Sequence, residues 1–223
     1  MGRVSLTPFP SHAAEEAAEA ERRVVRKRRT ILEGATTAFL RDGYVGTSMD
    51  EVASLAGVSK QTVYKHFGDK ERLFTEVVLS IVDEAGDAVY EQVLRLQDSG
   101  DLEADLRDLA RRQLALVMQP RILQLRRLVI GEAGRFPELG RTFYERGPGR
   151  TIAALASVFS SLARRGLLEL EDPQLAAAHF NWLIMSIPLN RSMLLGDDEP
   201  PSPEQLARYA DAGVRVFVAA YGR

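Results

Sequence analysis

The sequence predicts an all-α protein of about nine helices, with a small N-terminal domain of three helices and a larger C-terminal helical domain. Apolar residues recur at helical spacing in most segments, and Gly, Pro and small polar residues stand where helices would begin or end. The alternating pattern of a strand is confined to Val214 to Val218. Helical neighbours outweigh that short stretch, so we expect no sheet.

The 223 residues, 45% of them hydrophobic, can bury the core of one large domain or of a small domain joined to a larger one. The absence of cysteine excludes disulfides, thiolate metal sites and thiol nucleophiles. No apolar stretch approaches the roughly 20 residues that cross a bilayer, and the N-terminus lacks the apolar region of a signal peptide. We therefore expect a cytoplasmic protein.

The N-terminal residues 1–21 are predicted to be a disordered arm or an extension of the next helix. Pro8 and Pro10 favour disorder in the first ten residues, whereas the Ala/Glu run after them can continue a helix. From Arg22 a helix is predicted as far as Asp42, with Gly43 as its stop. Its inward residues would be Ile31, Leu32, Ala35, Ala38 and Phe39.

Residues 47–70 predict two short helices joined by a tight turn. Ser48, with Glu51 three positions later, has the spacing of a capping box, so the first helix starts at Ser48 or Met49. Gly57 ends it, because glycine adopts positive φ without a Cβ penalty. Ser59 is the expected N-cap of the second helix, whose inward residues would be Val58, Val63 and Phe67.

The outward face of this second helix carries donors and cations, the groups that contact phosphates and base edges in a major groove. A helix-turn-helix presents the N-terminal part of its second helix to the bases. Lys60 and Gln61 are therefore predicted to read sequence. Thr62, Tyr64 and His66 would hold phosphates. The candidate DNA-binding residues are Ser48, Ser59, Lys60, Gln61, Thr62, Tyr64, Lys65, His66 and Lys70, with Arg26 and Arg29 as flanking phosphate contacts.

Two alternatives apply to these residues. A short helical hairpin can serve packing alone, but the polar outward face disfavours that interpretation. Arg26 and Arg29 can also belong to a solvated basic surface. The charge distribution favours DNA binding: residues 22–70 carry +5, residues 1–21 carry −3 and residues 71–223 carry −4, for a net charge of −2. A basic binding domain attached to an acidic body is the expected pattern.

One segment resembles the signature of the TetR family of transcriptional regulators: TSMDEVASLAGVSKQTVYKHFGDK, continued through Glu71 and Leu73. The resemblance is strong over about residues 24–95. Farther on, GEAGRFPELGRTFYERGPGR and DPQLAAAHF are similar to the AcrR/AefR-like branch. The resemblance to the TetR family implies that seven residues occupy DNA-contacting positions: Ser48, Lys60, Gln61, Thr62, Tyr64, His66 and Lys70. It also implies an inducer pocket among the central C-terminal helices and dimerisation through the last two long helices.

Residues 71–223 are predicted to form the ligand-binding and dimerisation domain. A helix capped by Asp69 runs from Lys70 to about residue 96, roughly 40 Å, and would link the two domains rigidly. Further helices are expected at 102–118, 121–135, 138–165, 173–195 and 203–221. Asp172 and Ser202 each precede a proline at the first helical position. The sequence Gly147-Pro148-Gly149 would interrupt one helix, and Pro188 would bend the next.

A ligand pocket needs apolar walls and a few polar groups that orient the ligand. The candidate walls are Met118, Phe136, Phe143, Phe159, Trp182 and Met185, and the candidate polar groups are Arg127, Glu132, His179 and Asn181. Plain core packing is the alternative for the apolar residues. Leu206, Ala210, Gly213, Val214 and Phe217 form one apolar face of the last helix, predicted to pair with the 173–195 helix in a two-fold homodimer.

The sequence thus predicts a ligand-responsive regulator, a repressor that binds a palindromic operator as a homodimer and is released by a small-molecule inducer. An activator, or a DNA-binding protein without a ligand response, is the alternative. A helical enzyme is disfavoured, because only His12, His66 and His179 are present and no Gly-rich phosphate loop or metal-spaced cluster occurs. We expect no cofactor, no metal and no membrane partner.

Overall fold

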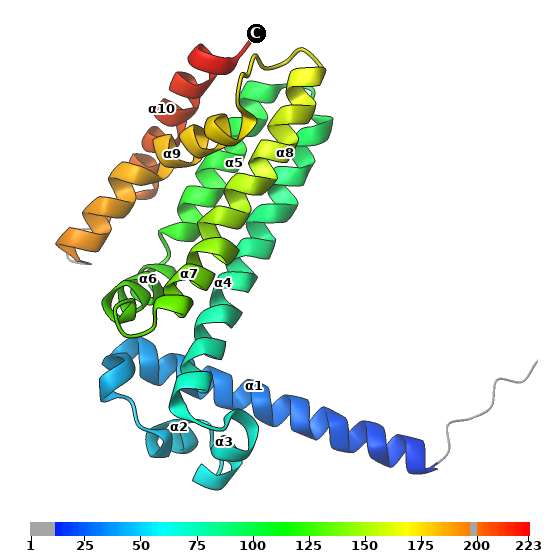
Figure 1. The fold of residues 1–223 in the computed structure, drawn as a ribbon, viewed down its shortest axis with the longest axis vertical. Helices are drawn as coiled ribbons and strands as arrows, with labels where there is room; N and C mark the ends of the chain where they lie inside the picture. Colours follow the sequence, from blue (N-terminus) through cyan, green and yellow to red (C-terminus); the bar gives the residue numbers. More distant parts are fainter. Residues whose placement is uncertain (1–11, 197–199) are drawn as a thin grey trace, which may run out of the picture. The chain divides into compact units, whose positions relative to one another are not determined.

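The computed structural model describes residues 12–196 and 200–223, and within them the chain forms ten α-helices (Figure 1). They are α1 His12–Gly46, α2 Met49–Leu55, α3 Lys60–Phe67, α4 Lys70–Arg95, α5 Leu102–Val117, α6 Pro120–Glu132, α7 Pro137–Tyr144, α8 Arg150–Arg164, α9 Pro173–Leu195 and α10 Pro203–Tyr221. A 3-10 turn, Leu96–Asp98, follows α4. The prediction of an all-α fold is confirmed.

The predicted helix at 138–165 is broken. A π-helical turn, Glu145–Gly149, separates α7 from α8, and Gly147 has non-helical backbone angles, φ −92° and ψ −106°. Proline at 148 removes a backbone donor at the same point, so the two helices cannot join regularly. Counted as one interrupted helix, α7 and α8 bring the described helices to the nine that the sequence predicted.

Contacts divide the chain into two compact units, Met1–Val77 and Val78–Arg223. The division falls later than Lys70, because the first turns of α4 bury Phe74 against the ring of Phe39, with centroids 5.1 Å apart. Helix α4 therefore contributes residues to both units.

The first unit is built by α1, α2, α3 and the start of α4. The long helix α1 already begins at His12, so the Ala/Glu run is helical, whereas the first ten residues lie outside the described part of the chain. Gly43 has φ 73° and ψ 178°, which ends the regular part of α1 where the sequence predicted a stop. Buried Ile31, Phe39, Val52, Val63 and Phe67 form its core with Phe74.

The second unit is a bundle in which α9 packs against α8 and α10, and α10 packs against α5. Its core includes three mutually packed rings, with Phe159 5.1 Å from Phe217 and Phe180 5.2 Å from Phe217 between centroids. Ser202 starts α10 with a complete capping box, formed with Gln205. Pro188 lies inside α9, which continues through it to Leu195.

Among the residues that the structure describes, β-structure is limited to one isolated bridge between Leu168 and Gly222. Val214 to Val218 are helical, as their neighbours predicted. None of the described helices combines the length and apolar character that crossing a bilayer requires.

Candidate nucleic-acid interface and ligand cavity

The turn between α2 and α3 is fixed by backbone geometry. Gly57 has φ +63°, a backbone conformation that residues other than glycine rarely adopt. The amide of Val58 donates to the carbonyl of Ala53 over 3.0 Å, which closes the turn. Ser59 then caps α3, because its hydroxyl accepts from the amide of Thr62 over 3.2 Å. The sequence predicted both the turn and this cap.

Helix α3 separates a buried side from an exposed polar side. Val63 and Phe67 are buried, whereas Lys60, Gln61, Tyr64 and Lys65 are exposed. Thr62 and His66 are half-buried at the margins of that polar side. We call the six residues from Lys60 to His66, Val63 excepted, the α3 face. All six lie on the side of α3 that the sequence assigned to DNA.

Lys60 on the α3 face is already engaged in an ion pair. Its Nζ lies 2.9 Å from the Oδ2 of Asp50 in α2, and both side chains are more than half exposed. The hydrogen bond with Asp50 raises the pKa of Lys60, so its charge is secure at neutral pH. An exposed pair of this kind contributes little stability, because solvent screens its attraction. A nucleic acid could therefore compete with Asp50 at small cost.

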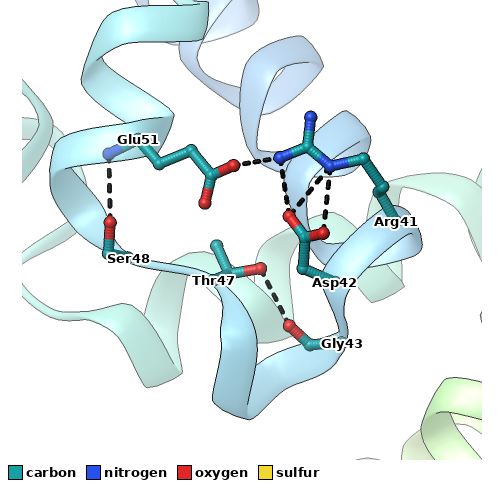
Figure 2. A network of polar contacts seen from close by, with 6 residues as sticks. All are labelled: Arg41, Asp42, Gly43, Thr47, Ser48 and Glu51. Carbon is teal, nitrogen blue, oxygen red and sulfur yellow. Dashed lines mark hydrogen bonds and ion pairs between the residues drawn. The ribbon is translucent and has the colours of Figure 1, made fainter.

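The start of α2 differs from the predicted capping box (Figure 2). The hydroxyl of Ser48 accepts from the amide of Glu51 over 3.2 Å, as expected. The carboxylate of Glu51, however, accepts from Arg41 of α1 instead of returning to the cap, so that half of the prediction is wrong. A carboxylate forms a stronger hydrogen bond with a guanidinium than with a backbone amide.

Arg41 is held in place by two acids. It also donates to Asp42 over 2.6 Å, and these bonds, the one with Asp42 first, raise its pKa. The hydroxyl of Thr47 donates to the carbonyl of Gly43 over 2.8 Å and secures the segment before Ser48 (Figure 2). These hydrogen bonds join α1 to α2, the helix that precedes α3.

Lys70 begins α4, where a cation opposes the helix dipole. Its Nζ lies 4.6 Å from the centroid of the Tyr44 ring and 3.4 Å from the carbonyl oxygen of Val45. These contacts offset the unfavourable position and hold the ammonium at one place. Asp69 caps α4 as predicted, since its carboxylate accepts from the amide of Arg72 over 2.8 Å.

The basic run in α1 divides into structural and exposed residues. Arg28 pairs with Glu76 and lies 5.0 Å from the centroid of the Phe67 ring, so it ties α1 to α3 and α4. Arg26 and Arg29 are exposed, and Arg29 lies 3.6 Å from the carboxylate of Glu33.

Burial, followed by the charges of Lys65, Arg28 and Lys27, lowers the pKa of His66, which is thus neutral at pH 7.

The second unit contains a mostly apolar cavity with about 660 Å³ of empty space, including the part open to solvent. The cavity volume without that open part is about 70 Å³, so the cavity is narrow. Helices α4, α5, α6, α7, α8 and α9 and the π-helical turn all contribute to its lining. Three predicted wall residues, Phe143, Trp182 and Met185, line it, and so does Asn181.

The other candidates for the pocket lie elsewhere. Phe159 and Met118 belong to the packed core, as the plain-core alternative proposed. Arg127 donates to the carbonyl of Ser192 over 2.8 Å. His179 is exposed and lies 2.6 Å from the hydroxyl of Tyr221. Phe136 lies beneath Arg135, whose guanidinium carbon is 5.3 Å from the ring centroid. Glu132, at the end of α6, is also absent from the cavity lining.

The cavity holds three polar residues that the sequence did not single out: Gln113, Arg126 and Thr151. Gln113 donates to the side-chain oxygen of Asn181 over 3.0 Å in a buried bond. Arg126 is half-buried, and burial lowers its pKa. Its position follows Ile122 by one helical turn, and Ile122 also lines the cavity. The sequence alone does not separate Arg126 from Arg127, because the apolar residue Leu123 precedes Arg127 by the same spacing.

The predicted dimer residues lie largely inside the protomer. Ala210, Gly213, Val214 and Phe217 are buried, and Leu206 is half-buried against the same core. The reason is the close approach of α10 to α9, at Gly213. The exposed apolar side chains of these two helices are different ones: Leu175, Trp182, Leu183, Ile187, Leu194 and Leu195 of α9, and Val216 of α10.

Two family descriptions match the chain. Residues 31–77 match the bacterial regulatory proteins of the tetR family, and residues 104–223 match the C-terminal domain of AefR-like transcriptional repressors. Among solved structures, one described as a TetR-family transcriptional regulator from Mesorhizobium loti MAFF303099 is 46% identical, covers 90% of this chain and 99% of its own, and has a TM-score of 0.85. The flavonoid-responsive regulator FrrA is 34% identical, covers 88% and 97%, and has a TM-score of 0.67.

Two curated relatives match shorter parts of the chain. The transcriptional regulator YhgD of Bacillus subtilis is 43% identical over 60 residues, 27% of this chain and 31% of its own length. RutR of Escherichia coli K12 is 35% identical over 71 residues, 32% of this chain and 34% of its own. The chain thus spans about a third of the length of these curated relatives.

Proposed function

This chain belongs to the TetR family of transcriptional regulators, and from that premise we propose that it is a repressor that binds a palindromic operator as a homodimer and leaves it when a small molecule binds. The α3 face carries the proposal: cations and donors cover one side of a helix whose other side, Val63 and Phe67, is buried. Its relatives are transcriptional regulators rather than enzymes.

For DNA recognition, we assign base contacts to Lys60 and Gln61, which stand in the first turn of α3. Thr62, Tyr64, Lys65 and His66 are assigned to phosphates, since they follow along the same exposed side. Lys70 is a suitable further phosphate contact, because the ring of Tyr44 and the carbonyl of Val45 hold its ammonium in position. Ser48, Ser59, Arg26 and Arg29 would add contacts at the margins.

For dimerisation, the exposed side of α9 supports a second copy of this chain as the partner. Leu175, Leu183, Ile187 and Leu194 follow one another at spacings that keep them near one side of the helix, and each is at least 40% exposed. An isologous interface would cover this stripe in both copies. Two α3 faces about one helical turn of DNA apart, roughly 34 Å, would then match a palindromic operator.

Measuring the oligomeric state tests dimerisation through α9. The double variant Leu183→Glu/Ile187→Glu is expected to run as a monomer in light scattering and to lose operator binding, since half-sites would be bound singly. Ile130→Glu is the matched control, because Ile130 is 61% exposed on α6. A double variant that remains dimeric removes α9 from the interface.

For release, the cavity supports a ligand-responsive mechanism. Val82, Ala85 and Val89 of α4 line it, and the same helix supplies Lys70 to Val77 to the first unit. A ligand that shifts α4 would move the α3 faces out of register with the two half-sites. FrrA, described as flavonoid-responsive, is a relative whose likeness spans most of both chains. Ligand and operator would then weaken each other's binding by the same factor.

The experiment is an operator titration in the presence and absence of ligand. A random duplex library first identifies the bound DNA, and fluorescence anisotropy then measures its affinity. Weaker operator binding at saturating ligand supports release, whereas unchanged affinity for a ligand that does bind the protein indicates a regulator without a switch. Transcription from the operator in a reporter strain distinguishes a repressor from an activator.

A further inference from the structure

The cavity in the second unit contains one cation and no acid among its described lining residues. The cation is Arg126 of α6; the rest of the lining is apolar, amide, hydroxyl or glycine. Burial alone accounts for the lowered pKa of Arg126, with no acidic neighbour acting against it. An arginine remains protonated at neutral pH even so. The cavity therefore presents a positive charge that its own lining does not neutralise.

The guanidinium of Arg126 is only partly satisfied. Its Nε is buried and makes no hydrogen bond to any described residue. Its central carbon lies 5.4 Å from the centroid of Phe143, another lining residue, so the ring restricts where the group can move. An unsatisfied buried donor is costly, and a guanidinium forms its strongest hydrogen bonds with an anionic oxygen. A bound anion would supply the hydrogen-bond acceptor that the protein does not provide for this guanidinium.

A second unsatisfied atom lies in the same lining. Gln113 uses its amide nitrogen to bond Asn181 over 3.0 Å, whereas its buried Oε1 has no partner among the described residues. This oxygen can only accept a hydrogen bond. A hydroxyl on the ligand is the group that fits it.

The lining and the small volume of the cavity favour an aromatic skeleton. The cavity volume is about 70 Å³, so the space is narrow. Phe143 and Trp182 both line it, and aromatic rings pack well against one another in offset or edge-to-face geometry. A flat ring system fits such a space with less rearrangement than a globular aliphatic one.

We propose that this cavity binds a planar aromatic monoanion, with its carboxylate or phenolate oxygen on Arg126, its ring against Phe143 and Trp182, and any ring hydroxyl donating to Gln113. The proposal deepens the proposed function, because it names the chemical class of the releasing ligand. It excludes cationic ligands, which would meet the charge of Arg126, and it ranks neutral analogues below the anion.

The test compares 2-naphthoate with 2-naphthamide, which share a ring and differ in charge, by isothermal titration of the full chain. We expect the carboxylate to bind roughly 10- to 100-fold more tightly than the amide, the usual range for a hydrogen bond to a charged partner. Arg126→Met should remove that preference, and Arg126→Lys should keep part of it. Arg127→Met is the matched control, because Arg127 is adjacent on α6 but bonds the Ser192 carbonyl.

A second readout follows the ionisation of the ligand. A nitrophenol absorbs at longer wavelength as its anion, so binding beside Arg126 should increase the anion band at a fixed pH below the ligand's pKa. The increase should be absent with Arg126→Met and present with Arg127→Met. Circular dichroism confirms that each variant is folded before it is compared.

Equal binding of 2-naphthoate and 2-naphthamide, tighter binding of 2-naphthylmethylammonium, or no binding by any of the three would overturn the proposal. An unchanged preference in Arg126→Met would also overturn it. The operator titration is separate: if 2-naphthoate binds through Arg126 and operator affinity does not change, the anion site stands and the release mechanism fails.

Discussion

Gly213 of α10 allows the close approach of α9, and its replacement gives a sharp prediction. A Cβ added at Gly213 would lie 3.1 Å from the backbone carbon and 3.1 Å from the carbonyl oxygen of Leu183, and 3.2 Å from Cγ1 of Ile184. The first two atoms belong to the backbone of α9 and cannot rotate away. Gly213→Ala would therefore push the two helices apart.

Two opposing effects set the magnitude. Alanine is preferred over glycine in a helix interior by about 1 kcal/mol, whereas overpacking a core costs typically about 1 to 3 kcal/mol. Gly140→Ala isolates the first effect, because Gly140 lies within α7 and its added Cβ would meet only Ala133 at an ordinary 3.6 Å. We expect Gly140→Ala to stabilise the protein, and Gly213→Ala to be less stable than Gly140→Ala by roughly 1 to 3 kcal/mol.

Urea denaturation followed by circular dichroism measures both variants against the wild type. The comparison uses transition midpoints with equal slopes, since a changed slope would indicate a change in the denatured state or loss of two-state behaviour. A Gly213→Ala variant as stable as Gly140→Ala would contradict this prediction, because it would show that α9 and α10 accommodate the added methyl group without cost.

Three further predictions concern DNA binding and pH. Lys70→Ala should lower affinity evenly across sequences and reduce the slope of log affinity against log salt by about 1, whereas Lys60→Ala should relax base preference; anisotropy with operator and mutated duplexes separates the two. His66 has a lowered pKa in the free protein. If a phosphate lies beside it in the complex, acidification from pH 7.5 to pH 6 should strengthen operator binding, and His66→Gln should abolish that trend; a wild-type affinity independent of pH would remove this contact. The hydrogen bond from Arg111 lowers the pKa of Asp211, so this pair stabilises the fold above the unfolded pKa of about 4 and loses its effect as pH falls through the lower folded value. Asp211→Asn should thus cost less than about 1 kcal/mol at pH 7 and nothing at pH 2 in urea denaturation, and an equal loss at both would contradict the assignment.

The caps and stops of the helices could be predicted from sequence because their chemistry is local. Ser59 bonds an amide three residues away, and Ser202 and Gln205 complete a capping box within one turn. Gly57 adopts positive φ for a reason that depends only on its missing Cβ. The polar and apolar sides of α3 likewise follow from its own periodicity.

The predictions that were wrong involve contacts between residues that are distant in the sequence. Glu51 was assigned to its own cap, but Arg41 reaches it from another helix. Arg127 was preferred to Arg126, although the orientation of α6 in the bundle decides which of the two lines the cavity. Gly213 was interpreted as a contact between protomers, whereas it makes its close approach to α9 of the same chain. Periodicity identifies a small apolar face but not which helix covers it.

Recognition of DNA by α3 can be measured by selecting duplexes from a random library with the purified chain, comparing wild type and a Lys60→Ala/Gln61→Ala variant at moderate salt. We expect the wild type to enrich a palindrome with half-site centres about one helical turn apart, and the variant to lose preference at two symmetric positions. No enrichment over random competitor, or an identical palindrome from both proteins, would contradict recognition by α3.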